Sequence, residues 1–116
     1  SRTVGCRILV IGCGSVGRCS LPLLRQLLIN DLTPQSITVL DCALPPAAVL
    51  EWLKKANIKF EQQLLAEDSY GDLLCNYLSE GDLLLDLGFN VSTEALVRWC
   101  QQNLVIFVNT TVDVWL

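Results

Sequence analysis

Three glycines are spaced so that their backbone could hold a phosphate group. They are Gly12, Gly14 and Gly17, in the order Gly-x-Gly-x-x-Gly. In a dinucleotide-binding loop the first glycine permits a tight turn, the second lets the backbone approach a pyrophosphate, and the third lets a helix pack on a strand. The backbone N–H groups of Gly14, Ser15 and Val16 would then point at the phosphates, helped by the helix dipole. No Lys-Ser or Lys-Thr pair follows the glycines, which excludes a Walker loop.

A carboxylate further along the chain is the second candidate group. Asp41 ends a predicted strand, 24 residues after Gly17, where it would accept hydrogen bonds from the hydroxyls of an adenosine ribose. It would repel the 2′-phosphate of NADP, and neither Cys42 nor the next few residues provide an arginine to receive that phosphate. The sequence therefore predicts NAD as the cofactor. The alternatives are a solvated aspartate at a strand end and a glycine turn without a ligand.

Small polar residues after two later predicted strands form the third set. The segment GFNVS contains Asn90 and Ser92, and NTTVDVW contains Thr110. Because these segments follow strands of the same predicted sheet, we expect Asn90, Ser92 and Thr110 to approach the nicotinamide ribose. Helix capping and turn formation would explain Ser92 and Asn90 equally well without a ligand.

Alternating strand and helix patterns position these candidates. Apolar runs predict strands at 7–11, 37–41, 58–63, 82–87 and 104–108. Apolar residues at helical spacing predict helices after the glycines and at 45–56, 67–78 and 92–102, and the composition of 30–36 predicts a turn. The expected fold is α/β of Rossmann type, a doubly wound parallel sheet of about five strands with helices on both faces. All candidate residues then follow the carboxyl ends of strands, where such sheets bind ligands.

Composition narrows the class of protein. The 116 residues suit one domain, 52% of them are hydrophobic, and the net charge of −4 with no basic cluster argues against nucleic-acid binding. No apolar run approaches the roughly 20 residues of a membrane span, and no signal-peptide pattern opens the chain, so we expect a cytoplasmic protein. Six cysteines without a Cys-x-x-Cys pair, and no histidine, offer no zinc site, so we expect reduced, buried thiols.

No catalytic constellation is visible in the chain. It has no histidine, no nucleophile with a positioned base and no pair of carboxylates that spacing brings together. If hydride chemistry occurs, the cofactor carries it, and the groups that hold the substrate come from elsewhere. We therefore expect residues 1–116 to be a single NAD(P)-binding Rossmann domain, a fragment of a longer enzyme and inactive alone.

Three blocks together resemble the amino-terminal cofactor domain of bacterial homospermidine synthase, a relative of saccharopine dehydrogenase. The blocks are VIGCGSVGRCSLPLL, LDLGFNVSTEALVRWC and LVIFVNTTVDVWL. In the last block Asp113 and Val114 stand where the family has Glu and Pro. The resemblance implies an NAD-dependent transferase: a diamine such as putrescine is oxidised to an imine, ammonia leaves, a second amine attacks, and the same cofactor reduces the adduct. It implies a polyamine substrate held by residues downstream; assembly into a homo-oligomer stays open.

Two alternatives remain from the sequence. One is a freestanding dinucleotide-binding or redox-sensing module without catalysis, in which Cys13 would be a sensor thiol. A complete module should end in a surface helix or a polar tail, so the apolar VDVWL favours a domain cut from a longer chain, or one that pairs with a partner. The other alternative is the cofactor domain of a different saccharopine dehydrogenase-like oxidoreductase.

Overall fold

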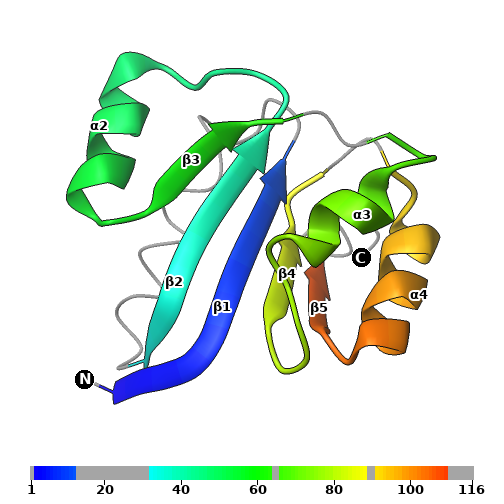
Figure 1. Cartoon of the computed structure of the whole chain (residues 1–116). Coiled ribbons are helices and arrows are strands. Elements are labelled where there is room, and N and C mark those ends of the chain that lie inside the picture. The colour runs from blue at the N-terminus through cyan, green and yellow to red at the C-terminus, as the bar shows by residue number, and fades with distance from the viewer. Residues whose placement is uncertain (1, 13–31, 64–65, 89–90, 110–116) are drawn as a thin grey trace, which may run out of the picture.

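A five-stranded parallel sheet forms the centre of the molecule (Figure 1). The computed structural model describes residues 2–12, 32–63, 66–88 and 91–109. The elements in chain order are β1 (Arg2–Gly12), β2 (Leu32–Asp41), α2 (Ala47–Lys55), β3 (Lys59–Gln62), α3 (Tyr70–Cys75), β4 (Leu83–Asp86), α4 (Thr93–Asn103) and β5 (Ile106–Asn109). The helix expected after the glycines lies outside the described residues.

The strand order is β3-β2-β1-β4-β5, with every neighbouring pair parallel. From the central β1 the chain first builds outward on one side through β2 and β3. It then crosses to the other side of β1 for β4 and β5. This reversal makes the junction of β1 and β4 the topological switch point of a doubly wound sheet, where such folds bind ligands. The predicted α/β fold of Rossmann type is confirmed.

Each face of the sheet has its own apolar core, as the continuous apolar run of β1 requires. Successive side chains of a strand point to opposite faces, so a strand covered on both sides is apolar at every position. On one face, Ile8 and Val10 pack in a cluster with Val49 and Leu53 of α2. On the other face, Leu9 and Ile11 share a cluster with residues of α3 and α4, namely Leu74, Leu96, Trp99 and Cys100. Helices on both faces are therefore confirmed, and Figure 1 shows α2 on the β3 side and α3 with α4 on the β4 side.

The turn predicted at 30–36 is wrong, because β2 begins at Leu32 and pairs with β1 from there. Proline suggested a turn, since it has no N–H to donate to a neighbouring strand. Pro34 is nevertheless tolerated, because β3 pairs only with 38–41 of β2 and so leaves this part of β2 with β1 alone among the described strands. The register also shifts between Val4 and Arg7, where two residues of β1 oppose one residue of β2, which is the pattern of a bulge.

Helix α3 is shorter than the predicted 67–78. It begins only at Tyr70, after a turn in which the N–H groups of Ser69 and Tyr70 both donate to the carbonyl of Ala66. Its last turn tightens at Asn76, whose N–H donates to the carbonyl three residues earlier. The spacing of apolar residues correctly predicts a helix in this segment. The polar residues Asp68 and Ser69 favour a turn in place of the first turn of that helix.

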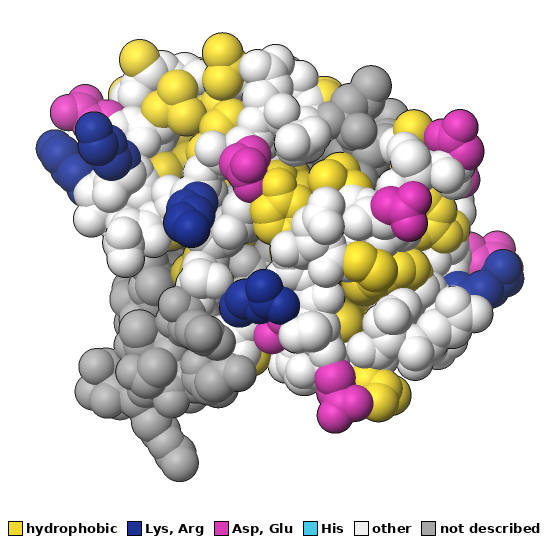
Figure 2. Space-filling view, in the orientation of Figure 1, with side chains coloured by type: hydrophobic (Ala, Val, Ile, Leu, Met, Phe, Trp, Pro, Cys, Tyr) yellow, Lys and Arg dark blue, Asp and Glu magenta, His cyan; other side chains and the backbone are white. Residues whose placement is uncertain are grey.

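The side of the molecule that includes α3 and α4 carries mainly acidic side chains among hydrophobic ones, as Figure 2 shows. Most basic side chains in this view lie nearer α2 and β3. Among the described helices, none combines the length and the apolar character needed to cross a membrane.

Candidate functional site

Polar residues line up along the carboxyl-end edge of the sheet. The register pairs Gly12 of β1 with Asp41 of β2, and Asp41 with Gln62 of β3. On the other side of β1, Ile11 pairs with Asp86 of β4, and Asp86 with Asn109 of β5. The last residue of each of four strands is thus polar, and these residues flank the glycine that ends the central strand. In the sequence these four residues lie up to 68 positions apart, from Asp41 to Asn109, and the parallel register brings them into one row.

Asp41 lies where the sequence predicted it, at the end of β2 and beside Gly12. Its side chain is 1% exposed, and its Oδ1 accepts a hydrogen bond of 3.0 Å from the backbone N of Ala43. The carbonyl of Asp41 also accepts from the backbone N of Gln63, at 3.0 Å. These bonds fix both the carboxylate and the turn that leaves the strand. A fixed carboxylate beside the first glycine is the arrangement that a dinucleotide site needs on its adenosine side.

Asp86 is a second buried carboxylate at the carboxyl-end edge, and it is not among the residues predicted from the sequence. It is 3% exposed, and its Oδ1 accepts a hydrogen bond of 2.9 Å from the backbone N of Gly88. Gly88 has a φ of +110°, which only glycine adopts easily. The backbone N of Leu87 donates to the carbonyl of Ile11 at 2.8 Å and so carries the contact between β1 and β4 one residue further. The sequence signal that could have indicated this residue is an aspartate within an apolar run, two positions before a glycine.

Ser92 caps helix α4, which was the alternative explanation of its residue type. It has extended backbone angles, and its Oγ accepts a hydrogen bond of 3.1 Å from the backbone N of Ala95. The helix start also lies near the end of β5, since Nδ2 of Asn109 is 3.5 Å from Oγ1 of Thr93. The positive end of the α4 dipole therefore lies at the carboxyl-end edge. Contact of Ser92 with a cofactor stays a prediction.

The structure thus brings two predicted site residues, Gly12 and Asp41, next to each other, and places Ser92 at a helix start on the same edge. The remaining predicted residues lie outside the described part of the chain: Gly14, Ser15, Val16, Gly17, Asn90 and Thr110. The donor and acceptor chemistry of the described residues fits a dinucleotide. A buried carboxylate can accept from ribose hydroxyls, and the central strand ends in a glycine that allows close backbone approach.

A cluster at the opposite, amino-end edge of the sheet ties β1 to the start of β4. The carboxylate of Asp82, 4% exposed, accepts hydrogen bonds from the backbone N of Arg7 (2.8 Å), from Arg7 Nε (3.1 Å) and from the backbone N of Ser79 (2.8 Å). Burial by itself would raise the pKa of this carboxyl. The two backbone hydrogen bonds and the Arg7 guanidinium outweigh burial and lower the pKa below its ordinary value.

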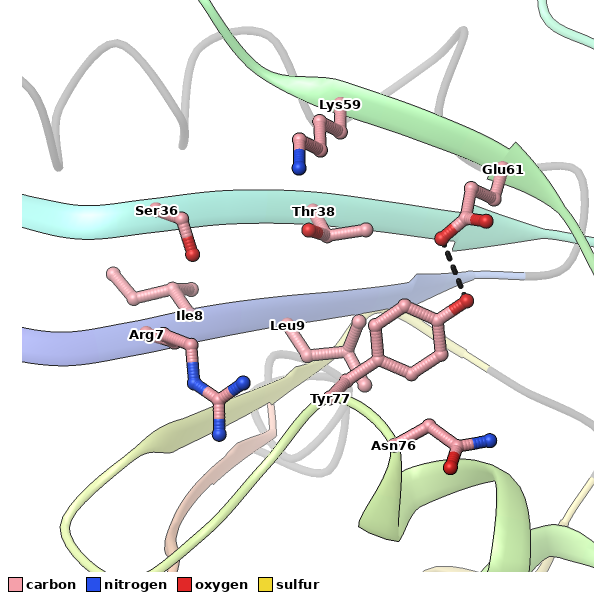
Figure 3. Close-up of a pocket in the computed structure, with 9 residues that line it drawn as sticks. All are labelled: Arg7, Ile8, Leu9, Ser36, Thr38, Lys59, Glu61, Asn76 and Tyr77. Atoms are coloured by element: carbon pink, nitrogen blue, oxygen red, sulfur yellow. Dashed lines mark hydrogen bonds between the residues drawn. The ribbon is translucent and has the colours of Figure 1, made fainter.

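A polar cavity of about 310 Å³ lies on the sheet face that carries Leu9, beside the end of α3 (Figure 3). Arg7, Thr38 and Lys59 line it together with Glu61 and Tyr77. The hydroxyl of Tyr77 donates to Oε2 of Glu61 at 2.6 Å. Burial, and then the hydrogen bond and charge of Glu61, raise the pKa of Tyr77 to about 12, so the phenol stays protonated. The cavity contains none of the predicted site residues.

The described cysteines correct one expectation. Cys100 is buried, and burial raises the pKa of its thiol to about 11, so it is an unreactive core residue. Cys75, in contrast, is exposed, and Cys6 and Cys42 are only half-buried, so burial does not explain them as predicted. Each of these thiols is reduced in the structure. Cys13 lies outside the described residues. Among the residues that the structure describes, no three His, Cys, Asp or Glu side chains are placed to hold a metal ion.

Comparison of the sequence with models of protein families identifies the family of this chain. The model described as the saccharopine dehydrogenase NADP binding domain matches residues 8–114. This chain belongs to that family. The resemblance drawn from the three sequence blocks is thereby confirmed at the level of the family.

Individual proteins similar to this chain are homospermidine synthases. The homospermidine synthase of Mesorhizobium japonicum is 30% identical over 112 residues, which are 94% of this chain and 22% of that protein. The homospermidine synthase of Blastochloris viridis is 27% identical over 112 residues, with the same coverage. The crystal structure of the Legionella pneumophila homospermidine synthase in complex with NAD has the same fold, with a TM-score of 0.74 and 23% identity over 92% of this chain. The chain spans 22% of the length of each of these relatives.

Proposed function

We propose that this saccharopine dehydrogenase-type domain binds NAD at the carboxyl-end edge of its sheet. The observation that carries the proposal is the buried Asp41 carboxylate, held beside Gly12 at the end of the central strand. In this assignment Asp41 accepts hydrogen bonds from the adenosine ribose. Gly12, Gly14, Ser15, Val16 and Gly17 hold the pyrophosphate, and Asn90, Ser92 and Thr110 approach the nicotinamide ribose.

The carboxylate of Asp41 also supports NAD over NADP. The family description names NADP, and the Legionella structure contains NAD, so the family leaves the choice open. A 2′-phosphate would face a buried negative charge at Asp41, and the sequence has no arginine or lysine from Cys42 to Leu53 to neutralise it. The cost of that repulsion exceeds the gain from any neutral hydrogen bond, because burial lowers the effective dielectric.

The parent protein of this domain, in our proposal, is a homospermidine synthase-like enzyme. NAD would accept and return a hydride during aminobutyl transfer between polyamines, and the polyamine would be held by residues downstream. The similarity to two homospermidine synthases, of whose length the matched segment is 22%, supports this assignment. On its own, residues 1–116 would form a single cofactor domain that binds NAD and turns nothing over. We propose a cytoplasmic enzyme without nucleic-acid or membrane partners.

Exposed apolar residues on β5 support the view that this domain packs on further protein. This strand ends the sheet on one side, and Ile106 and Val108 are 56% and 40% exposed. In a complete single-domain protein such a strand would be blunted by charge or covered. Within the described part of the chain, no comparable observation favours a freestanding sensor module.

Calorimetric titration with NAD and with NADP tests the proposed cofactor site. Asp41→Asn is the decisive variant, because an asparagine oxygen can still accept from the backbone N of Ala43 while the charge is lost. We expect wild type to bind NAD more tightly than NADP by at least about tenfold, and Asp41→Asn to lose most of that preference. Gly14→Ala should abolish binding of both nucleotides, because a Cβ blocks the approach of the pyrophosphate.

Glu94→Gln is the matched control for removal of one carboxylate, since Glu94 is exposed on α4. It should leave both affinities within about twofold. A folded wild type that binds neither nucleotide, or an Asp41→Asn variant with an unchanged preference for NAD, would contradict the proposal.

A further inference from the structure

Two buried carboxylates flank β1 at the carboxyl-end edge, one on each side of the switch point. Asp41 adjoins β1 through Gly12, and Asp86 adjoins it through Ile11. They are 1% and 3% exposed. In a doubly wound sheet the dinucleotide lies across the switch point, so its two halves extend over opposite sides of β1. With the adenosine half assigned to the β2 side, Asp86 lies on the side of the nicotinamide half.

The position of the Asp86 carboxyl group is fixed by its surroundings. One carboxylate oxygen accepts from the backbone N of Gly88, in a turn that needs the positive φ of that glycine. The residue next to it, Leu87, is held against β1 by its own backbone hydrogen bond to Ile11. Because the side chain is buried, solvent reorients little around it, and its field extends further than that of a surface carboxylate.

The two redox forms of the nicotinamide differ in charge. The oxidised ring carries one positive charge, and the reduced ring is neutral. A fixed negative charge on the nicotinamide side therefore stabilises the oxidised form, and it does so without contact, because the effective dielectric at such a site is about 20 rather than that of water. The Asp41 charge, on the adenosine side, is further from the ring and faces a group whose charge does not change.

We propose that Asp86 sets the redox preference of the bound cofactor, its charge favouring NAD⁺ over NADH. This inference rests on the proposed NAD site. It divides the work of the edge between two like residues: Asp41 selects the nucleotide, and Asp86 biases its oxidation state. An enzyme that begins each cycle by oxidising a substrate would gain from such a bias, because it keeps the resting cofactor oxidised.

The test compares the dissociation constants of NAD⁺ and NADH, with NAD⁺ measured by calorimetry and NADH by its fluorescence. Asp86→Asn is the main variant, because its amide oxygen can still accept from Gly88 while the charge is removed. We expect the ratio Kd(NADH)/Kd(NAD⁺) to fall about fivefold relative to wild type. Asp41→Asn is the matched control: it removes the other buried charge and should weaken both forms alike, leaving the ratio within about twofold.

An unchanged ratio in Asp86→Asn, or an equal fall in Asp41→Asn, would overturn the inference. If Asp86→Asn does not fold, as judged by circular dichroism, Asp86→Ser decides the matter in its place. Its hydroxyl can accept from Gly88, and it too is neutral, so the same fall is expected. A wild type that binds neither NAD⁺ nor NADH would instead refute the proposed function, so the two failures are distinguishable.

Discussion

The two ends of β4 carry the same residue type in opposite circumstances. Asp82 stands just before the strand and Asp86 ends it, and both are almost fully buried. Both oxygens of the Asp82 carboxylate accept hydrogen bonds from Arg7 and Ser79, and these bonds join β1 to the start of β4. Asp86 accepts from the turn that follows its own strand, at the edge that carries Asp41 and Gly12. Residue type and burial therefore do not distinguish the aspartate that joins β1 to β4 from the one that we propose acts on the cofactor. What distinguishes them is the end of the parallel strand at which each lies.

The largest expected effect is the loss of the Asp82 cluster. Asp82→Ala leaves the backbone N–H groups of Arg7 and Ser79 without their acceptor, so we expect the free energy of unfolding to fall by about 3 kcal/mol. Urea unfolding measures it. Glu80→Ala, at an exposed neighbour, should change stability by less than about 0.5 kcal/mol. A loss below about 1 kcal/mol in Asp82→Ala would contradict the claim that Asp82 stabilises the fold.

The contribution of the ionised Asp82 carboxylate to stability should depend on pH. The pKa of Asp82 is lower in the folded chain than its ordinary value, so the unfolded chain binds the proton first. The stabilisation is complete above the ordinary pKa of about 3.9 and is lost as the pH falls through the lower folded-state pKa. Unfolding free energies measured from pH 6 down to pH 2 should fall less steeply in Asp82→Asn than in wild type. Equal slopes would show that the Asp82 carboxyl titrates alike in both states.

Ser92 offers a smaller test at the carboxyl-end edge. Ser92→Ala removes the oxygen that accepts from the backbone N of Ala95, so we expect a loss of about 1 kcal/mol of stability. Ser92→Asp keeps an acceptor and adds a charge that suits the start of a helix, so it should retain wild-type stability. If alanine and aspartate were equally destabilising, the cap would not explain the serine.

The smallest effect belongs to a surface ion pair on the same helix. Arg98 and Glu94 are one turn apart at 3.1 Å, and their side chains are 65% and 83% exposed. Glu94→Gln should cost about 0.3 kcal/mol at low salt, because solvent screens the pair. Thermal unfolding in 1 M salt should erase even that difference. A cost comparable with that of Ser92→Ala would mean that the surface charges of α4 matter more than its cap.

The sequence predicted the five strands, the parallel fold and the place of Asp41, because apolar runs and motif spacing are local signals. It did not single out Asp86, which we propose as a site residue. In the sequence this aspartate only continues an apolar run, and its place beside the central strand comes from pairing with Ile11, which lies 75 positions earlier. Pro34 led to the wrong prediction of a turn. The sequence does not show that, among the described strands, this part of β2 pairs with β1 alone, which is why a proline is tolerated in it. Cys75 was expected to be buried because it adjoins an apolar run, but it is an exposed residue at the end of α3.

The central claim is that residues at the carboxyl-end edge bind NAD, whereas the Asp82 cluster at the amino-end edge stabilises the folded state. Thermal unfolding with and without saturating NAD tests this claim. A ligand that binds only the folded state raises the unfolding temperature according to its affinity. In Asp82→Asn we predict a lower starting temperature with the wild-type rise on adding NAD. In Asp41→Asn we predict a near wild-type starting temperature with a much smaller rise. No rise in the wild type, or an undiminished rise in Asp41→Asn, would contradict the account.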